Sequence, residues 1–251
     1  PMRNWLNAWR DSRFAWLRRA YHAARSLWGG LRTLLLPRLR AEWWSALRHR
    51  GQQHQRASFT QMHRYPALFE QCRRHCAEVA RPRLLSFGCS TGEEVFSLAE
   101  LIPHGQFVGV DLNEWCLAEA RHRDVSQRHR FWLATSEAFA NETGFDIICC
   151  LAVFQRSENR SDPPPDTVRG HTFAQFEEAL TQLDRKLKPN GLLLLDHTEF
   201  RFADTALAAR HEPLDFPENA VLRHRPLFGP DGRKIADEHT SPRVFRKRRD
   251  E

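Results

Sequence analysis

Residues Leu84–Ala99 read Leu-Leu-Ser-Phe-Gly-Cys-Ser-Thr-Gly-Glu-Glu-Val-Phe-Ser-Leu-Ala, and this stretch decides the fold. Its apolar start predicts a short buried strand, and the part from about residue 92 onward predicts a helix. Gly88 and Gly92 allow the backbone to turn tightly between the two and allow a ligand to approach the main chain. In open parallel sheets, ligands bind at such turns, at the carboxyl ends of the strands. The stretch therefore predicts a binding loop for a nucleotide-like ligand.

Strand and helix patterns alternate along the rest of the chain. Further strands are predicted at 107–110, 130–133, 145–153, 191–195, 221–225 and 244–248, with a turn at 228–232. Helices are predicted at about 59–80, 114–122 and 172–187. The first strands are continuous apolar runs, which are typical of a parallel sheet covered on both faces. The predicted fold class is α/β, a Rossmann-like, doubly wound, mostly parallel seven-stranded sheet.

The end of the second predicted strand narrows the choice of ligand. Asp111 stands there, 19 residues after Gly92. A carboxylate at this place can accept hydrogen bonds from both hydroxyls of a ribose. The glycine spacing is not G-x-G-x-x-G, and no Gly-Lys-Ser/Thr follows it. A dinucleotide or a nucleoside triphosphate is therefore not favoured.

These segments resemble the class I methyltransferases that use S-adenosyl-L-methionine. The loop in Leu84–Ala99 is especially similar to that of the chemotaxis-receptor methyltransferases. Further matches, in family order and at family spacing, are Val108–Asn113 (VGVDLN), Phe145–Ile148 (FDII) and Leu187–Leu192 (LKPNGL). The resemblance covers about residues 60–200. It implies a Rossmann-like domain that binds S-adenosylmethionine as its cofactor.

The resemblance also implies roles for the matching residues. The cofactor loop would consist of Gly88, Cys89, Ser90, Thr91, Gly92 and Glu93. Gly88, Ser90 and Gly92 would line the methionine part of the cofactor, and Glu93 would order the loop. Asp111 would hold the ribose, with Leu112 beside the adenine. Ser136 and Glu137 lie where the family contacts the adenine amine, although they could instead cap a helix. Leu151 and Ala152 would lie beside the sulfonium and the acceptor.

Alternative functions remain open. A protein carboxyl methyltransferase of the receptor type is one, although the sequence shows neither the N-terminal helical domain nor the inserted small sheet of that family. A cofactor-binding regulatory protein without turnover is another. The loop also satisfies G-x-S-x-G, the nucleophile elbow of α/β-hydrolases, with Ser90 as nucleophile. That reading is disfavoured because one predicted strand precedes Ser90 and Asp111 would have no role.

The acceptor side offers one candidate catalytic residue. His197 follows the fifth predicted strand, within Asp196-His197-Thr198-Glu199. It is the preferred general base, because imidazoles titrate near neutral pH. A structural hydrogen bond at a strand end is the alternative. Residues 151–154 lack the Asn/Asp-Pro-Pro-Tyr/Phe motif, which argues against methylation of the amino groups of bases or glutamine. The loop at 156–170 is interpreted as a substrate lid or a plain solvated loop.

The positive charge lies at the N-terminus. Residues 1–50 contain eleven arginines against Asp11 and Glu42, a net charge of +9, so the remaining residues sum to −2. Six of the eight tryptophans are also here. Helical spacing of the apolar residues predicts an amphipathic helix that ends near Pro37, then a short helix with Trp43, Trp44 and Leu47. Such a segment suits an anionic membrane surface, or a helical cap on the main domain. Nucleic acid is disfavoured, because the aromatic residues are not placed among the arginines.

The predicted organisation is a basic extension at 1–50, a polar linker at 51–58 and the cofactor domain at 59–251. An enzyme at the membrane surface would take its substrate there, so lipid-linked saccharides or other envelope precursors, such as lipopolysaccharide, are the expected acceptors.

The six scattered cysteines indicate a reducing cytosol. No segment reaches the ~20 apolar residues of a membrane span, and no signal peptide is recognised. The expectation is a cytoplasmic protein, peripheral at the inner membrane, with no metal and with self-association left open.

Overall fold

The computed structural model describes residues 23, 27–28, 31, 35–49, 60–155, 171–214, 226–236 and 242–249. The chain divides into two units between Trp44 and Ser45. The predicted linker at 51–58 lies outside the described residues. Helix α3 (Pro37–Arg48) confirms the predicted short helix with Trp43, Trp44 and Leu47. It begins at Pro37, because proline at a first helical position gives up no hydrogen bond.

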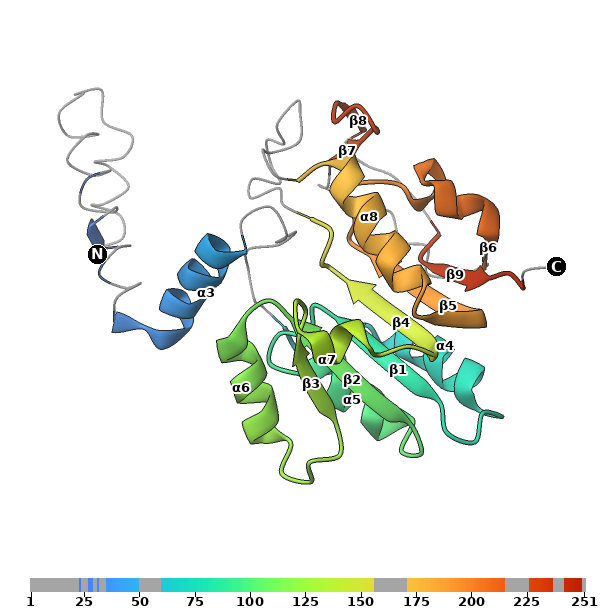
Figure 1. Cartoon of the computed structure of the whole chain (residues 1–251), viewed down its shortest axis with the longest axis horizontal. Coiled ribbons are helices and arrows are strands. Elements are labelled where there is room, and N and C mark those ends of the chain that lie inside the picture. The colour runs from blue at the N-terminus through green and yellow to red at the C-terminus, as the bar shows by residue number, and fades with distance from the viewer. Residues whose placement is uncertain are drawn as a thin grey trace, which may run out of the picture. The chain divides into compact units, whose positions relative to one another are not determined.

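A seven-stranded sheet forms the body of residues 45–251, in the order β3-β2-β1-β4-β5-β9-β6 (Figure 1). The strands are β1 (Arg83–Phe87), β2 (Gln106–Asp111), β3 (Arg130–Leu133), β4 (Phe145–Leu151), β5 (Leu187–Asp196), β6 (His211–Pro213) and β9 (Val244–Lys247). The first five are parallel, and β9 pairs antiparallel with β5 and β6. The predicted fold class is confirmed. The strand order reverses between β1 and β4, which is where such sheets bind ligands.

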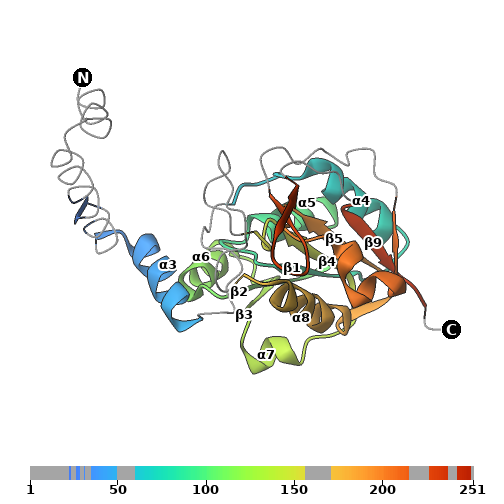
Figure 2. The same cartoon turned by 90° about the horizontal axis from the view of Figure 1, so that it is seen from above.

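Helices cover both faces of the sheet (Figure 2). They are α4 (Pro66–Cys76), α5 (Glu93–Leu101), α6 (Glu114–Arg123), α7 (Glu137–Ala140) and α8 (Phe173–Asp184). Short elements complete the fold: the 3₁₀ turns η1 (Phe202–Asp204) and η2 (Ala206–Arg210), and the hairpin of β7 (Leu227–Phe228) and β8 (Lys234–Ala236). One apolar cluster packs α4, α5 and α6 on one face, and a second packs α7 and α8 on the other.

Neighbouring residues of a strand enter different clusters, which explains the continuous apolar runs. Leu84 and Ile147 belong to the first cluster, whereas Leu85 and Ile148 belong to the second. Side chains of a strand alternate between its two faces, and here both faces are covered. The apolar runs of the sequence therefore correspond to strands that are buried on both sides.

Some predicted boundaries differ from the observed ones. The strand predicted at 244–248 is β9, and the turn at 228–232 joins β7 to β8, as predicted. The helix predicted at about 59–80 is shorter, because α4 begins only at Pro66. The predicted strand at 221–225 and the loop at 156–170 lie outside the described residues. The sheet's seventh described strand is β6, whose His-Glu-Pro sequence has no apolar run.

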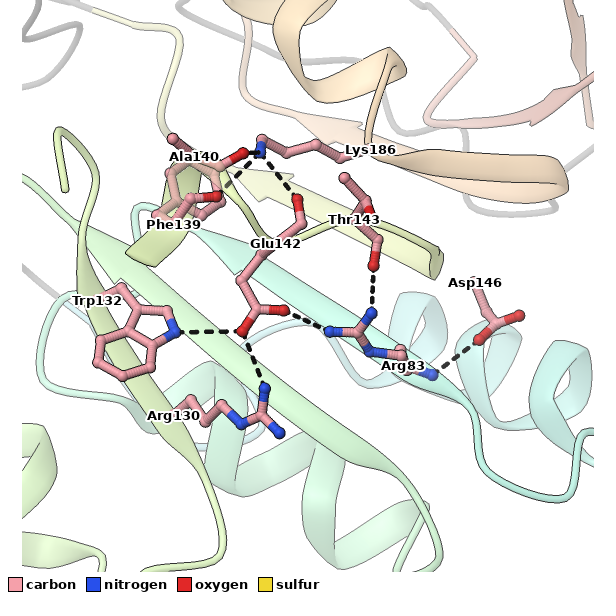
Figure 3. A network of polar contacts seen from close by, with 9 residues as sticks. All are labelled: Arg83, Arg130, Trp132, Phe139, Ala140, Glu142, Thr143, Asp146 and Lys186. Carbon is pink, nitrogen blue, oxygen red and sulfur yellow. Dashed lines mark hydrogen bonds and ion pairs between the residues drawn. The ribbon is translucent and has the colours of Figure 1, made fainter. Parts of the chain in front are cut away.

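A charged network joins the strands at their amino ends (Figure 3). Glu142 accepts from Arg130 at 3.0 Å and from Trp132 at 3.4 Å, and it also pairs with Arg83. Lys186 Nζ donates to three carbonyls, those of Phe139, Ala140 and Glu142, at 2.8–2.9 Å. Asp146 accepts from the Arg83 backbone amide at 2.8 Å. The network therefore ties β1, β3 and β5 to the segment between α7 and β4.

Replacing Glu142 with alanine is expected to lower the free energy of unfolding by roughly 1–3 kcal/mol, because Arg83, Arg130 and Trp132 lose a nearly buried charged acceptor. Arg130→Ala should cost less than about 1 kcal/mol, since that side chain is exposed. Chemical denaturation of both variants measures the difference. Equal losses in the two variants would contradict a central role for Glu142.

Burial would raise the pKa of Glu142, but hydrogen bonds from Arg130 and Arg83 outweigh it and hold that pKa below 4.5. A carboxyl with a lowered folded-state pKa contributes stability that is present above its unfolded pKa and lost as pH falls through the folded value. Glu142→Gln should therefore lose less stability on acidification below about pH 4.5 than the parent protein.

Candidate functional site

The carboxyl ends of β1, β2, β4 and β5 form the candidate site. The amides of Gly88 and Cys89 both donate to the carbonyl of Val110, at 2.8 and 2.9 Å, so the loop after β1 is fastened to the end of β2. Ser90, Ala152 and His197 have φ angles of 50°, 61° and 56°. Left-handed backbone at residues other than glycine is uncommon and concentrates at functional sites. Three such residues follow three neighbouring strands.

The two predicted loop glycines are required by their surroundings. Gly88 has φ 79° and Gly92 has φ 89°. A Cβ at Gly88 would come within 2.6 Å of Val153, and one at Gly92 within 2.8 Å of Phe96. A side chain at either position would therefore strain the loop and push neighbours away.

Asp111 holds the loop from the end of β2. Its Oδ2 accepts from the Ser90 amide and its Oδ1 accepts from the Asn113 amide, both at 2.8 Å. Burial raises the pKa of Asp111, although these backbone hydrogen bonds oppose the shift. Each carboxylate oxygen can accept two hydrogen bonds, so each keeps capacity for a ligand hydroxyl. Asp111, the predicted ribose-binding residue, thus also holds the loop after β1 in place.

Glu93 contacts both the loop and helix α6. Thr91 Oγ1 lies 2.7 and 2.9 Å from its two carboxylate oxygens. Arg123 of α6 pairs with Glu93 and donates to the Thr91 carbonyl at 2.9 Å. These contacts suit the predicted ordering role, because they join the start of α5 to α6.

Ser136 and Glu137 follow β3 at the same edge of the sheet. Ser136 is the N-cap of α7, and its side chain accepts from the Phe139 amide at 3.2 Å. The capping alternative is therefore present in the structure. Glu137 is exposed in the first turn of α7. Contact of either residue with an adenine amine stays a prediction.

The end of β4 packs beside the loop. Leu151 and Ala152 are buried, and the Ala152 amide donates to the Asp196 carbonyl at 2.9 Å. Val153 is the side chain that a Cβ on Gly88 would strike. Residues 151–153 thus join the loop after β1 to the end of β5.

His197 is held by a buried carboxylate. Its Nδ1 lies 2.6 Å from Asp196 Oδ2, and Arg243 donates to the same oxygen at 2.9 Å. Burial would raise the pKa of Asp196, but His197 and Arg243 outweigh it and hold that pKa below its usual value. An ionised carboxylate can only accept, so Nδ1 is the donor and Nε2 carries the lone pair of the neutral ring. The His197 side chain is 24% exposed, so it is accessible from outside.

Two groups near the site were missed by sequence reasoning. Glu94 is half-buried at the start of α5, and burial raises its pKa to about 7, against the opposing effects of Ser86 and Arg64. Its Oε1 has no hydrogen-bond partner among the described residues. Tyr65 packs edge-to-face on His197, with ring centroids 5.9 Å apart. The sequence does show the pair Glu93-Glu94, but only the helix phase decides which of the two turns inward.

Comparison with known proteins adds a family match. Residues 85–193 match the family model described as a methyltransferase domain. An uncharacterized protein of Synechococcus is 30% identical over 134 residues, which are 51% of this chain and 28% of that protein. This chain therefore spans less than a third of that relative's length.

Solved structures with lower identity also match. An amino pentose methyltransferase from Micromonospora echinaspora, with S-adenosylmethionine bound, is 23% identical with a TM-score of 0.40, covering 61% of this chain and 54% of that one. An S-adenosylmethionine-dependent methyltransferase from Thiobacillus denitrificans, with S-adenosyl-L-homocysteine, is 20% identical with a TM-score of 0.35, covering 63% and 54%.

Proposed function

We propose that this chain, whose residues 85–193 match a methyltransferase domain, is an S-adenosylmethionine-dependent methyltransferase. It would methylate a hydroxyl group of a saccharide or other envelope-associated acceptor at the cytoplasmic face of a membrane. The observation that carries the proposal is the junction of the loop 88–93, Asp111 and the Asp196–His197 pair at one edge of the sheet. The membrane part is supported by the arginines and tryptophans of residues 1–50.

The residues present fit the cofactor. The glycine loop would lie against the methionine part, and the remaining lone pairs of Asp111 would accept from the ribose hydroxyls. Leu112, Ser136 and Glu137 would lie toward the adenine. Glu94 has a buried oxygen without a described partner, which matches the α-ammonium of the methionine part. The bound cofactor would supply an electrophilic methyl group on a sulfonium.

His197 would act on the acceptor. Nε2 would accept the proton of the acceptor hydroxyl, and Asp196 would stabilise the resulting imidazolium. Arg243 would keep Asp196 ionised and in place. The other task of the site is positioning, because a methyl transfer needs the nucleophile, carbon and leaving sulfur in line.

The hydrolase alternative finds less support. β1 is the first strand of the described chain, whereas a hydrolase elbow follows several strands and an oxyanion loop. Asp111, which would be idle in a hydrolase, holds the loop here.

The test is transfer of a labelled methyl group. The full chain is incubated with methyl-labelled S-adenosylmethionine and a lipid-linked saccharide fraction. We expect label in a linkage that resists mild alkali, as a methyl ether does. Label released by mild alkali would indicate a carboxyl ester and the receptor-type alternative. Retained cofactor binding without any transfer would indicate a regulatory protein.

A pH-dependent cofactor affinity is predicted from Glu94. With a pKa of about 7, Glu94 is largely protonated at pH 6 and ionised at pH 8. An ammonium group binds the ionised form, so affinity for S-adenosylmethionine should rise over this range. Glu94→Gln should weaken binding at pH 8 and remove the rise, as measured by titration calorimetry. Glu100→Gln, on the exposed end of the same helix, is the control.

The stability of the cofactor-free protein should change in the opposite sense. The folded state keeps the Glu94 proton between its usual value of 4.5 and about 7, whereas the unfolded chain releases it. Stability therefore falls as pH rises through this window. Glu94→Gln should flatten that fall, and an unchanged pH profile would refute the assignment.

A further inference from the structure

Helix α3 presents an apolar stripe to solvent. Arg40, Trp43 and Leu47 recur at intervals of three and four residues, which places them on one side of the helix, and Leu36 immediately precedes its first residue, Pro37. Trp43 is 54% exposed, Leu36 43% and Leu47 37%. Trp44 is also exposed and packs edge-to-face on Trp43, with ring centroids 5.0 Å apart. A surface helix normally turns such a stripe inward, so this one indicates a binding surface.

The polar side of the same helix is bonded to residues near the end of β2. Ser45 is buried, and its Oγ donates to the carbonyl of Leu112 at 3.1 Å. Trp43 and Leu47 are each two residues from Ser45, so they lie about 160° around the helix from it. Arg48 adds an ion pair with Glu114 at 3.9 Å. The end of the helix is thus held through a serine and an arginine, while Leu47 is exposed.

These attachments reach the turn that follows Asp111. Leu112 is the next residue after Asp111, and Glu114 begins α6. Both contacts lie within residues 45–251. The end of α3 is therefore bonded to the turn on which the cofactor's ribose and adenine would rest.

The positive charge of the N-terminal residues indicates which partner binds the exposed apolar side of α3. Arg40 lies within it and is exposed. Residues 1–50 contain eleven arginines against two acids. A second copy of this chain would bring the same positive charge, which opposes close approach. An anionic lipid surface supplies the opposite charge, and its interface is where tryptophan is favoured. Among the described residues, no helix is both long and apolar enough to cross a bilayer.

We propose that α3 is an interfacial helix that binds an anionic lipid surface through Trp43, Trp44 and Leu47, together with Leu36 just before the helix. Ser45 and Arg48, the part of the helix that belongs to residues 45–251, bond to Leu112 and Glu114 in the turn after β2. The inference rests on the proposed function only where it explains how a lipid-linked acceptor reaches the site. Binding to lipid itself is independent of methyl transfer.

The experiment is cosedimentation of the full chain with vesicles. We expect binding to phosphatidylglycerol-containing vesicles and much weaker binding to pure phosphatidylcholine. Trp43→Ser with Leu47→Ser should weaken binding about tenfold or more. Val125→Ser with Ile235→Ser is the matched control, because both are exposed apolar residues outside α3, and binding should be unchanged. Circular dichroism confirms that both variants are folded.

Three results would overturn the proposal: equal loss of binding in both double variants, equal binding to both kinds of vesicle, or no vesicle binding together with a dimer that the α3 variant dissociates. The last result, read by analytical ultracentrifugation, would assign the stripe to a second copy. The methyl-transfer assay is run separately with a detergent-dispersed acceptor. Failure of vesicle binding would leave that assay unaffected, and the reverse also holds.

Discussion

Replacing Asp111 with alanine is expected to weaken binding of S-adenosylmethionine by tenfold or more. The variant loses the acceptors for the Ser90 and Asn113 amides, each now bonded at 2.8 Å, together with those proposed for the ribose. Hydrogen bonds to a charged group contribute roughly 1.5–3 kcal/mol each, and about 1.4 kcal/mol is tenfold in affinity. Asp111→Asn should fall between parent and alanine, because one of its two side-chain positions still accepts. Titration calorimetry with the cofactor or its demethylated product measures the loss.

Asp124→Ala is the matched control for that experiment. Asp124 is also a buried acid that accepts from backbone amides, those of Arg128 and His129, but it follows the opposite end of α6. Its loss should reduce thermal stability and leave cofactor affinity nearly unchanged. If Asp111→Ala binds the cofactor as tightly as the parent does, Asp111 does not hold the ribose.

The second large effect is expected at His197. His197→Gln should lower kcat by about 10²–10⁴, the usual contribution of a positioned general base. Cofactor affinity should stay within about twofold, because His197 takes no part in the proposed cofactor contacts. Asp196→Asn should lower kcat as well, since it removes the ionised acceptor that fixes the ring and stabilises the imidazolium. Both are read by steady-state kinetics with a saturating cofactor.

His63→Gln serves as the control histidine, because His63 is half exposed and pairs with Glu100. Its kcat should equal that of the parent. A full kcat in His197→Gln would show that the acceptor needs no base, as a carboxylate acceptor does not. In that case the receptor-type alternative would replace hydroxyl methylation.

The loop and the sheet could be predicted because their signals are local. Gly88 and Gly92 stand where the backbone has positive φ and where a Cβ would collide. Strands buried on both faces leave uninterrupted apolar runs, so β1 to β5 were visible in order. β6 was not visible, because His-Glu-Pro becomes a strand only through pairing with β9.

The residues of the candidate site also fall into two groups: those that the sequence alone predicts and those that only the tertiary structure identifies. Asp111 could be named from its place at the end of an apolar strand. The partner that holds His197 in place, Asp196, stands next to it in the sequence, but Arg243 is 47 residues away from Asp196. Glu94 is distinguished from Glu93 by the helix phase alone, which turns one toward buried neighbours and the other toward Arg123.

The sequence by itself determined the loop at 88–93, its position after a buried strand and the acid at the end of the next strand. These features follow from steric limits on single residues and from burial along one segment, which each stretch of chain carries with it. The tertiary structure alone decided that Ser45 bonds to Leu112 and that Glu142 joins Arg83 to Arg130. Such contacts join residues far apart in the chain, so they exist only after strand register and helix phase bring those residues together.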